Sequence, residues 1–78
     1  MNRVAEVNRE LVKLGHAERL TRGKGYYYFR LGDTARWPAT SVYVFRSSDL
    51  SLEDWLAEYE ALKARAYPEP IRNTAYAR

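Results

Sequence analysis

The chain of 78 residues contains no cysteine, which excludes a disulfide framework and a thiolate metal site. A reducing cytosol is therefore the expected setting. No hydrophobic run approaches the roughly 20 apolar residues that a membrane-spanning helix needs, so we expect no association with a membrane. Arg3 and Glu6 interrupt the apolar residues near the N-terminus, and a signal peptide is not expected either.

Histidine is nearly absent, because His16 is the only one. It follows a predicted helix end, where we expect a capping or surface residue, and no second histidine stands at a metal-binding spacing. Ser47 and Ser48 have no neighbouring base that would activate a nucleophile. The carboxylates between Glu53 and Glu60 are typical of a solvated helix face. We therefore expect no enzymatic activity, no cofactor and no bound metal.

Charge is present but unevenly distributed along the chain. Thirteen Lys and Arg against ten Asp and Glu give a net charge of +3. Residues 1–46 carry nine bases and four acids, which is +5, whereas residues 47–78 carry four bases and six acids, which is −2. The basic half suits an acidic partner, either nucleic acid or an acidic protein surface. A solubilising surface with a chance asymmetry is the alternative.

The first predicted helix spans residues 3–14. Its apolar positions recur at the spacing of one helical stripe, and they are Val4, Val7, Leu11 and Leu14. Asn2 suits the N-cap, and Gly15 suits a left-handed residue that ends the helix.

The second predicted helix begins at Ser51, which forms a capping box with Asp54. Its apolar face comprises Leu52, Trp55, Leu56, Tyr59, Leu62 and Ala66. The sequence Tyr67-Pro68 is expected to end this helix.

Aromatic and β-branched residues predict three strands between the helices. Residues 18–21 and 26–31 are expected to form a hairpin around a turn at residues 22–25, and residues 41–46 the third strand. The predicted fold class is α+β, a two-layer α-β-β-β-α arrangement. Its three-stranded antiparallel sheet would have both helices on one face and the other face open.

We expect residues 1–67 to form this single domain and residues 68–78 to be a loosely attached tail.

Four consecutive aromatic residues, 26–29, follow the two glycines of the predicted turn. Because side chains alternate along a strand, Tyr26, Tyr28 and Arg30 would share one face, and the residues between them the other. The sequence leaves open which alternate set of residues faces the helices, both here and in residues 41–46.

This basic, aromatic region is the candidate binding surface. Tyrosine, tryptophan and arginine are common anchors of protein interfaces, and the same rings stack on the bases of single-stranded nucleic acids. The candidate binding residues are Arg19, Arg22, Lys24, Tyr26, Tyr28, Arg30, Arg36, Trp37, Tyr43 and Arg46.

Two nucleic-acid-binding families match in part. Residues 22–29 resemble the aromatic motif of RNA-recognition domains, but Lys24 replaces the first stacking aromatic, and that family begins with a strand. The element order resembles the double-stranded RNA-binding domain, whose final helix begins with lysines. Here that position holds the acidic Glu53 and Asp54, which would repel phosphate.

A further resemblance covers residues 8–62. Its motifs are Leu14-Gly15-His16, Arg22-Gly23 with Gly25-Tyr26-Tyr27-Tyr28-Phe29, Trp37, Ser41-Val42-Tyr43-Val44, and Leu50-Ser51-Leu52-Glu53-Asp54-Trp55-Leu56. The pattern resembles small accessory proteins of bacterial phages, plasmids and genomic islands. The resemblance implies a protein that blocks host machinery, such as a CRISPR effector complex, in the bacterial cytosol.

We therefore expect a non-enzymatic inhibitor or adaptor that docks on a host protein or nucleoprotein complex through the basic aromatic hairpin. The alternative is direct DNA or RNA binding through the same surface.

Overall fold

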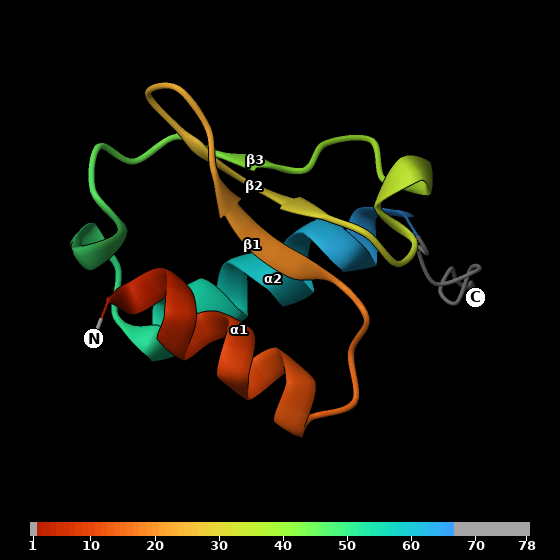
Figure 1. Cartoon of the computed structure of the whole chain (residues 1–78). Helices are drawn as coiled ribbons and strands as arrows, with labels where there is room; N and C mark the ends of the chain where they lie inside the picture. Colours follow the sequence, from red (N-terminus) through yellow and green to blue (C-terminus); the bar gives the residue numbers. More distant parts are fainter. Residues whose placement is uncertain (1, 67–78) are drawn as a thin grey trace, which may run out of the picture.

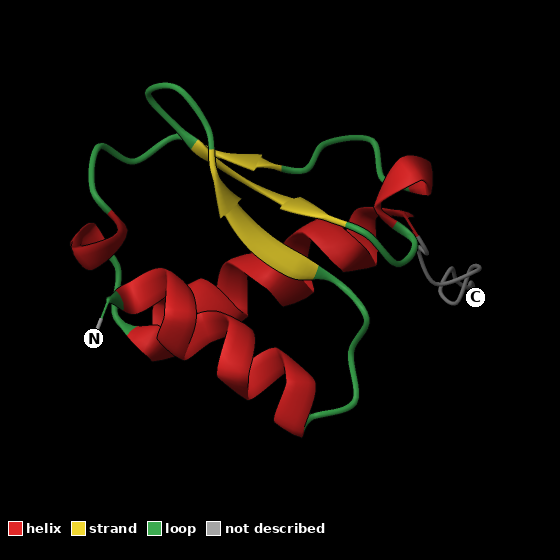
Figure 2. Cartoon of the chain, in the orientation of Figure 1, coloured by secondary structure: helices red, strands yellow, loops and turns green. Residues whose placement is uncertain are grey.

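The computed structural model describes residues 2–66, which form two helices and a three-stranded antiparallel sheet (Figure 1). Both helices lie on one side of the sheet, so the chain has two layers (Figure 2). The order of helix, three strands and helix confirms the predicted α+β class. The predicted tail, residues 68–78, lies outside the described residues.

Helix α1, Arg3–Lys13, has the predicted signals at both ends. The Asn2 side chain accepts a hydrogen bond from the Ala5 amide at 2.7 Å. At the other end Gly15 adopts a φ of +84°, and the His16 amide donates to the Leu11 carbonyl at 2.9 Å, as in a Schellman motif. Leu14, predicted to continue the apolar stripe, is instead exposed, because the helix ends one residue earlier.

The sheet has the order β1-β2-β3. Strand β1, Arg19–Arg22, pairs with β2, Tyr27–Arg30, over all four residues of each strand. The hairpin is therefore shifted slightly from its predicted bounds. β2 ends before Leu31, which adopts a left-handed φ of +71° and so cannot continue a strand.

Strand β3 is only Ser41–Val42, so the prediction of a strand over residues 41–46 was wrong in its length. Val42 pairs with Tyr27, the first residue of β2. The next residue towards the turn, Tyr26, already belongs to that turn, where its carbonyl accepts from the Gly23 amide at 2.7 Å. The chain beyond Val42 therefore has no strand to pair with.

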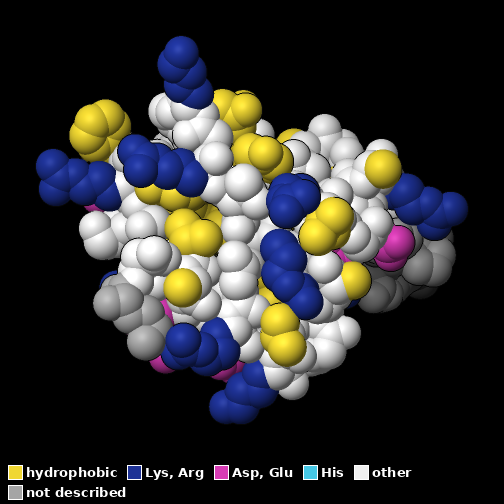
Figure 3. Space-filling view, viewed as in Figure 1, with side chains coloured by type: hydrophobic (Ala, Val, Ile, Leu, Met, Phe, Trp, Pro, Cys, Tyr) yellow, Lys and Arg dark blue, Asp and Glu magenta, His cyan; other side chains and the backbone are white. Residues whose placement is uncertain are grey.

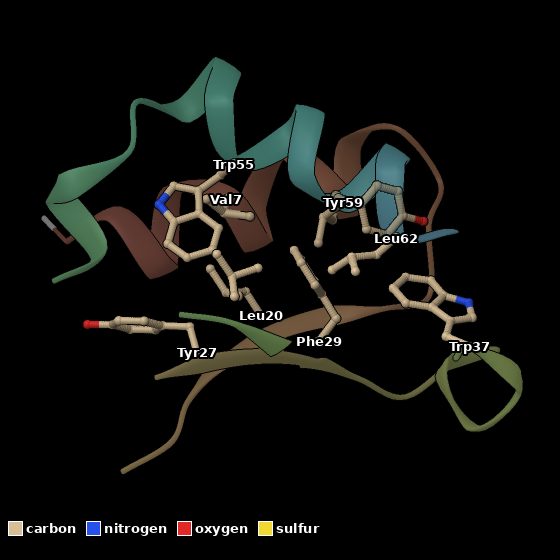
Figure 4. Packing of buried hydrophobic residues seen from close by; sticks show 10 residues of the cluster. Val7, Leu20, Tyr27, Phe29, Trp37, Trp55, Tyr59 and Leu62 are labelled. Atoms are coloured by element: carbon tan, nitrogen blue, oxygen red, sulfur yellow. The ribbon is translucent and has the colours of Figure 1, made fainter. Parts of the chain in front are cut away.

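The core lies between the sheet and the two helices (Figure 4). The sheet contributes Leu20, Tyr27, Phe29 and Val42, and the helices contribute Val7, Leu11, Trp55, Tyr59 and Leu62. The packing decides the question that the sequence left open. Tyr27 and Phe29 face the helices, and Tyr26 and Tyr28 are on the other side.

Helix α2, Leu52–Ala66, begins with the predicted cap, because the Ser51 hydroxyl accepts from the Asp54 amide at 3.0 Å. Its first buried residue is Trp55, whose indole N–H donates to the Ser47 carbonyl at 2.8 Å. Ser47 belongs to the short 3-10 helix η2, Ser47–Asp49. This bond therefore joins the start of α2 to the segment that leads out of the sheet.

A buried carboxylate joins the other end of α2 to the sheet. Glu18, only 4% exposed, accepts hydrogen bonds from the Tyr59 hydroxyl at 2.7 Å and from the Asp33 amide at 2.9 Å. Burial by itself raises the pKa of this carboxyl, but the two hydrogen bonds and the nearby Lys63 charge outweigh it, so the pKa is lowered overall. Burial and the bond to Glu18 raise the pKa of Tyr59. The ionised carboxylate is therefore the stabilised form.

Replacing this carboxylate should make the free energy of unfolding less dependent on pH in the acid range. A lowered pKa in the folded state contributes stability that is complete above the ordinary glutamate pKa of about 4.3, and it is lost as the pH falls through the folded-state pKa. We expect Glu18→Gln to lower the free energy of unfolding at pH 7 by about 1–3 kcal/mol. The difference from the wild type should shrink as the pH falls below 4, which urea unfolding at several pH values will measure.

The matched control is Glu58→Gln, which removes an exposed carboxylate from α2. Its stability should follow the wild type across the same pH range. The role given to Glu18 would be contradicted if the difference in free energy of unfolding from the wild type changed with pH equally in Glu18→Gln and Glu58→Gln.

Candidate binding surface

The face of the sheet opposite the helices is covered by neither α1 nor α2, and we call it the open face. Cross-strand partners share a face of a sheet, so the register places Thr21 beside Tyr28 and Ser41, and Arg19 beside Arg30, on the open face.

Three tyrosine rings gather on the open face, and we call them the tyrosine cluster: Tyr26, Tyr28 and Tyr43. The Tyr26 ring is central, with ring centroids 5.8 Å from Tyr28 and 5.9 Å from Tyr43. Tyr26 and Tyr28 are partly exposed, whereas Tyr43 is 81% exposed. Such ring distances are typical of interacting aromatic pairs. The cluster therefore presents aromatic surface that residues 2–66 do not bury.

Gly23 supports the position of the central ring. A side chain on Gly23 would begin 2.7 Å from the Cζ atom of Tyr26, so the ring lies directly over the glycine of the turn. The glycine thereby leaves the room in which Tyr26 contacts both other rings of the cluster.

Two arginines flank the cluster, and each is held by hydrogen bonds. Arg30 donates from its Nε to the Thr21 hydroxyl at 3.0 Å. Arg19 donates from one Nη atom to the carbonyls of His16 and Glu18, at 2.7 and 2.6 Å. None of these acceptors is a carboxylate group, so the two positive charges are not neutralised by these bonds.

The surrounding chain is also basic. Residues 19–46 carry six Lys and Arg and one acid, Asp33, which is +5, whereas residues 47–66 carry two bases and five acids, which is −3. In the view of Figure 3, Lys and Arg side chains are spread over the visible face with hydrophobic side chains between them, and acidic side chains appear near its edges. The sheet side and α2 therefore differ in charge.

The structure does not bring all ten predicted residues together. Trp37 belongs to the core, because it is only 6% exposed and its ring centroid lies 5.8 Å from that of Tyr59. It is therefore not a surface anchor. Arg36 lies in the 3-10 helix η1, Thr34–Arg36. This helix follows the C-terminal end of β2, whereas the hairpin turn precedes β2. Arg22 pairs with Tyr27 and so lies on the helix side of the sheet.

Lys24 and Arg46 are close in sequence to the cluster residues and lie outside the strands. Lys24 is exposed in the hairpin turn. Arg46 follows β3, and its guanidinium carbon lies 5.9 Å from the Phe45 ring centroid. Phe45 is 79% exposed and was not among the predicted residues. Its exposure adds a fourth aromatic ring near the cluster.

Comparisons of the chain with protein-family models, with curated proteins and with solved structures found no match. Within residues 2–66 no group of three or more His, Cys, Asp or Glu side chains is placed to hold a metal ion. Neither described helix is long and apolar enough to cross a bilayer. The open face is therefore the feature of the described residues from which a function can be inferred.

Substitution of Gly23 should disturb the tyrosine cluster without unfolding the chain. The new Cβ of Gly23→Ala would displace the Tyr26 ring, whereas the backbone at Gly23 has no left-handed φ that would oppose alanine. We expect NMR cross-peaks from the Tyr26 ring to Tyr28 and Tyr43 to weaken or disappear. The amide spectrum of α1 and α2 should be preserved.

The neighbouring Lys24→Ala is the control, because Lys24 is exposed in the same turn. Its ring cross-peaks should match those of the wild type. Unchanged cross-peaks in Gly23→Ala would show that the glycine does not position the ring.

Proposed function

We propose that this chain is a non-enzymatic binding protein that docks its open face on an acidic host protein or nucleoprotein complex. The observation that carries the proposal is the tyrosine cluster, flanked by Arg19 and Arg30 on a sheet face that neither helix covers. Tyrosine and arginine are enriched among the residues that dominate binding energy at interfaces.

The geometry favours binding in two physical ways. A tyrosine side chain supplies a large contact area and has only two torsion angles to fix, so ordering it on binding costs little entropy. The rings already contact one another, which reduces that cost further. The net charge of +5 over residues 19–46 attracts an acidic partner and speeds its association.

In the proposed biological role, the chain is an inhibitor or adaptor that is encoded by a mobile genetic element and binds host machinery, with a CRISPR effector as the favoured target. This part of the proposal is supported only by the resemblance of residues 8–62 to accessory proteins of phages, plasmids and genomic islands. The corresponding site of action would be the bacterial cytosol.

Direct binding of DNA or RNA is the second candidate, and the presence of exposed tyrosine beside arginine favours it. Exposed tyrosines beside cations form platforms for single-stranded bases, and each stacked base contributes about 1–3 kcal/mol. Tyr43 and Arg30 are exposed in this arrangement. The same side chains therefore serve either candidate, and a direct measurement of oligonucleotide binding separates the two.

The decisive experiment captures partners with the tagged chain from a nuclease-treated bacterial lysate. It then measures the affinity of the purified partner for the variants Tyr43→Ala and Arg30→Ala. Loss of an interface anchor costs about 1 kcal/mol or more, so we expect about fivefold weaker binding for Tyr43→Ala. Val12→Ala on α1 and Arg65→Ala on α2 are the controls, because both residues are exposed away from the open face.

Oligonucleotide binding is measured in parallel by fluorescence anisotropy, with short single strands and duplexes. Direct nucleic-acid binding should weaken steeply between 50 and 200 mM salt, on the order of tenfold or more. Absence of binding at low salt would remove the second candidate. A captured protein that binds the open-face variants and the controls equally well would contradict the first.

The inhibitor role has its own assay. The purified chain is added to target-cleavage reactions of purified CRISPR effectors. Inhibition by the wild type and by Val12→Ala, but not by Tyr43→Ala, would support the role. If no effector were inhibited, the proposed inhibition of CRISPR effectors would be contradicted. The proposed binding through the open face would not be affected by that result.

A further inference from the structure

A recess of about 460 Å³ lies on the helix side of the sheet, away from the open face. Its lining residues come from the start of α1, the hairpin ends of β1 and β2, and η2. Its lining includes Asn2, Val4, Ala5, Arg22, Tyr27 and Ser47. This volume falls within the range of small-molecule sites, which is about 300–1,000 Å³.

The Tyr27 side chain is largely buried, but its hydroxyl end is open and forms no hydrogen bond with the described residues. Tyr27 is only 5% exposed, and its ring packs against Trp55 with centroids 5.6 Å apart. Figure 4 shows the hydroxyl pointing out of the core cluster, and Tyr27 lines the recess. Because the Tyr27 ring lines the recess and its hydroxyl is open, this hydroxyl can donate a hydrogen bond to a ligand bound there.

Arg22 gives the recess its charge. Among the described residues it is the only ionisable lining side chain besides Tyr27, and the register places it directly opposite that residue. Among residues 2–66 Arg22 forms no salt bridge. The start of α1 adds the partial positive charge of a helix N-terminus. Among the described residues no carboxylate lines the recess, so the charge of its lining favours an anion.

The remaining lining residues determine shape. Val4, Ala5 and the Tyr27 ring provide an apolar wall. Asn8 also borders the recess, but both ends of its amide are occupied by the Leu20 backbone, at 2.6 and 2.9 Å. A ligand that fits this wall therefore has an apolar body as well as a charged group.

We propose that the recess binds a small anion, a carboxylate or phosphate carried on an aromatic or short aliphatic body. Arg22 pairs with the anionic group, the Tyr27 hydroxyl donates a hydrogen bond to it, and Val4 and Ala5 contact the body. This site does not depend on the proposed function, because its residues lie on the opposite side of the sheet from the tyrosine cluster.

The experiment is an amide NMR titration of the full chain with phenyl phosphate and with benzoate, which separates phosphate from carboxylate. Benzyl alcohol tests the body without charge, and inorganic phosphate tests the charge without a body. We expect saturable shifts confined to residues 2–8, 22, 27 and 47 with at least one aromatic anion. Benzyl alcohol and inorganic phosphate should each bind about tenfold more weakly or worse.

Two pairs of variants decide the contacts. Arg22→Gln should weaken binding of the aromatic anion about tenfold, and Tyr27→Phe, which keeps the core ring, about threefold or more. The matched variants Arg30→Gln and Tyr28→Phe remove the same groups from the open face and should leave the affinity unchanged. The amide spectrum of each free variant verifies that it is folded.

Absence of saturable shifts at ligand concentrations of about 10 mM would overturn the proposal. Shifts scattered over the surface, or equal losses in Arg22→Gln and Arg30→Gln, would overturn it as well, because they indicate general attraction of anions. None of these outcomes bears on partner binding by the open face, which the Tyr43→Ala comparison tests separately.

Discussion

The packing of Tyr27 and Phe29 against α2 is the constraint on which the other features depend. The Tyr27 ring meets Trp55 and the Phe29 ring meets Tyr59, with centroids 5.6 and 5.5 Å apart. Because side chains alternate along a strand, these two contacts fix the orientation of every residue in β2. Phenol and guanidinium groups at the intervening positions are consequently turned outwards. A shift of one residue would exchange core and surface over the whole strand.

Buried polar contacts hold this arrangement at the edges of the core. The Asn8 side chain forms hydrogen bonds with both backbone groups of Leu20 on the edge strand β1. Glu18, just before β1, is hydrogen-bonded both to Asp33 in the turn after β2 and to Tyr59 of α2. Both side chains satisfy groups that the sheet leaves unpaired, and unsatisfied buried groups would be costly. The apolar packing selects the face, and these polar contacts fix the relative placement of the elements.

Much of the fold was predictable because its signals are local. Asn2, Gly15 and Ser51 act within a few residues of the helix ends that they define, and the glycines mark the hairpin turn. The face of β2 was not predictable, since Tyr26 and Tyr27 are the same residue type and only contacts distant in sequence distinguish them. The same reason explains Trp37 and the short β3. Burial of Trp37 depends on Tyr59, 22 positions later, and the length of β3 depends on where β2 begins.

The candidate site was predicted in outline only. The tyrosines and the flanking arginines of the hairpin could be named because composition alone marks them. The roles of Gly23 and the Tyr27 hydroxyl could not, because each depends on which atoms lie opposite them in space.

The burial of both tryptophans has a spectroscopic consequence. Trp37 and Trp55 are the only indoles in the chain, and both lie in the core, whereas the open face carries phenols. Indole emission therefore reports on the integrity of the interior, and the ring resonances of Tyr26, Tyr28 and Tyr43 report on events at the open face. Unfolding and partner association are thus observable through separate side chains of the unlabelled protein.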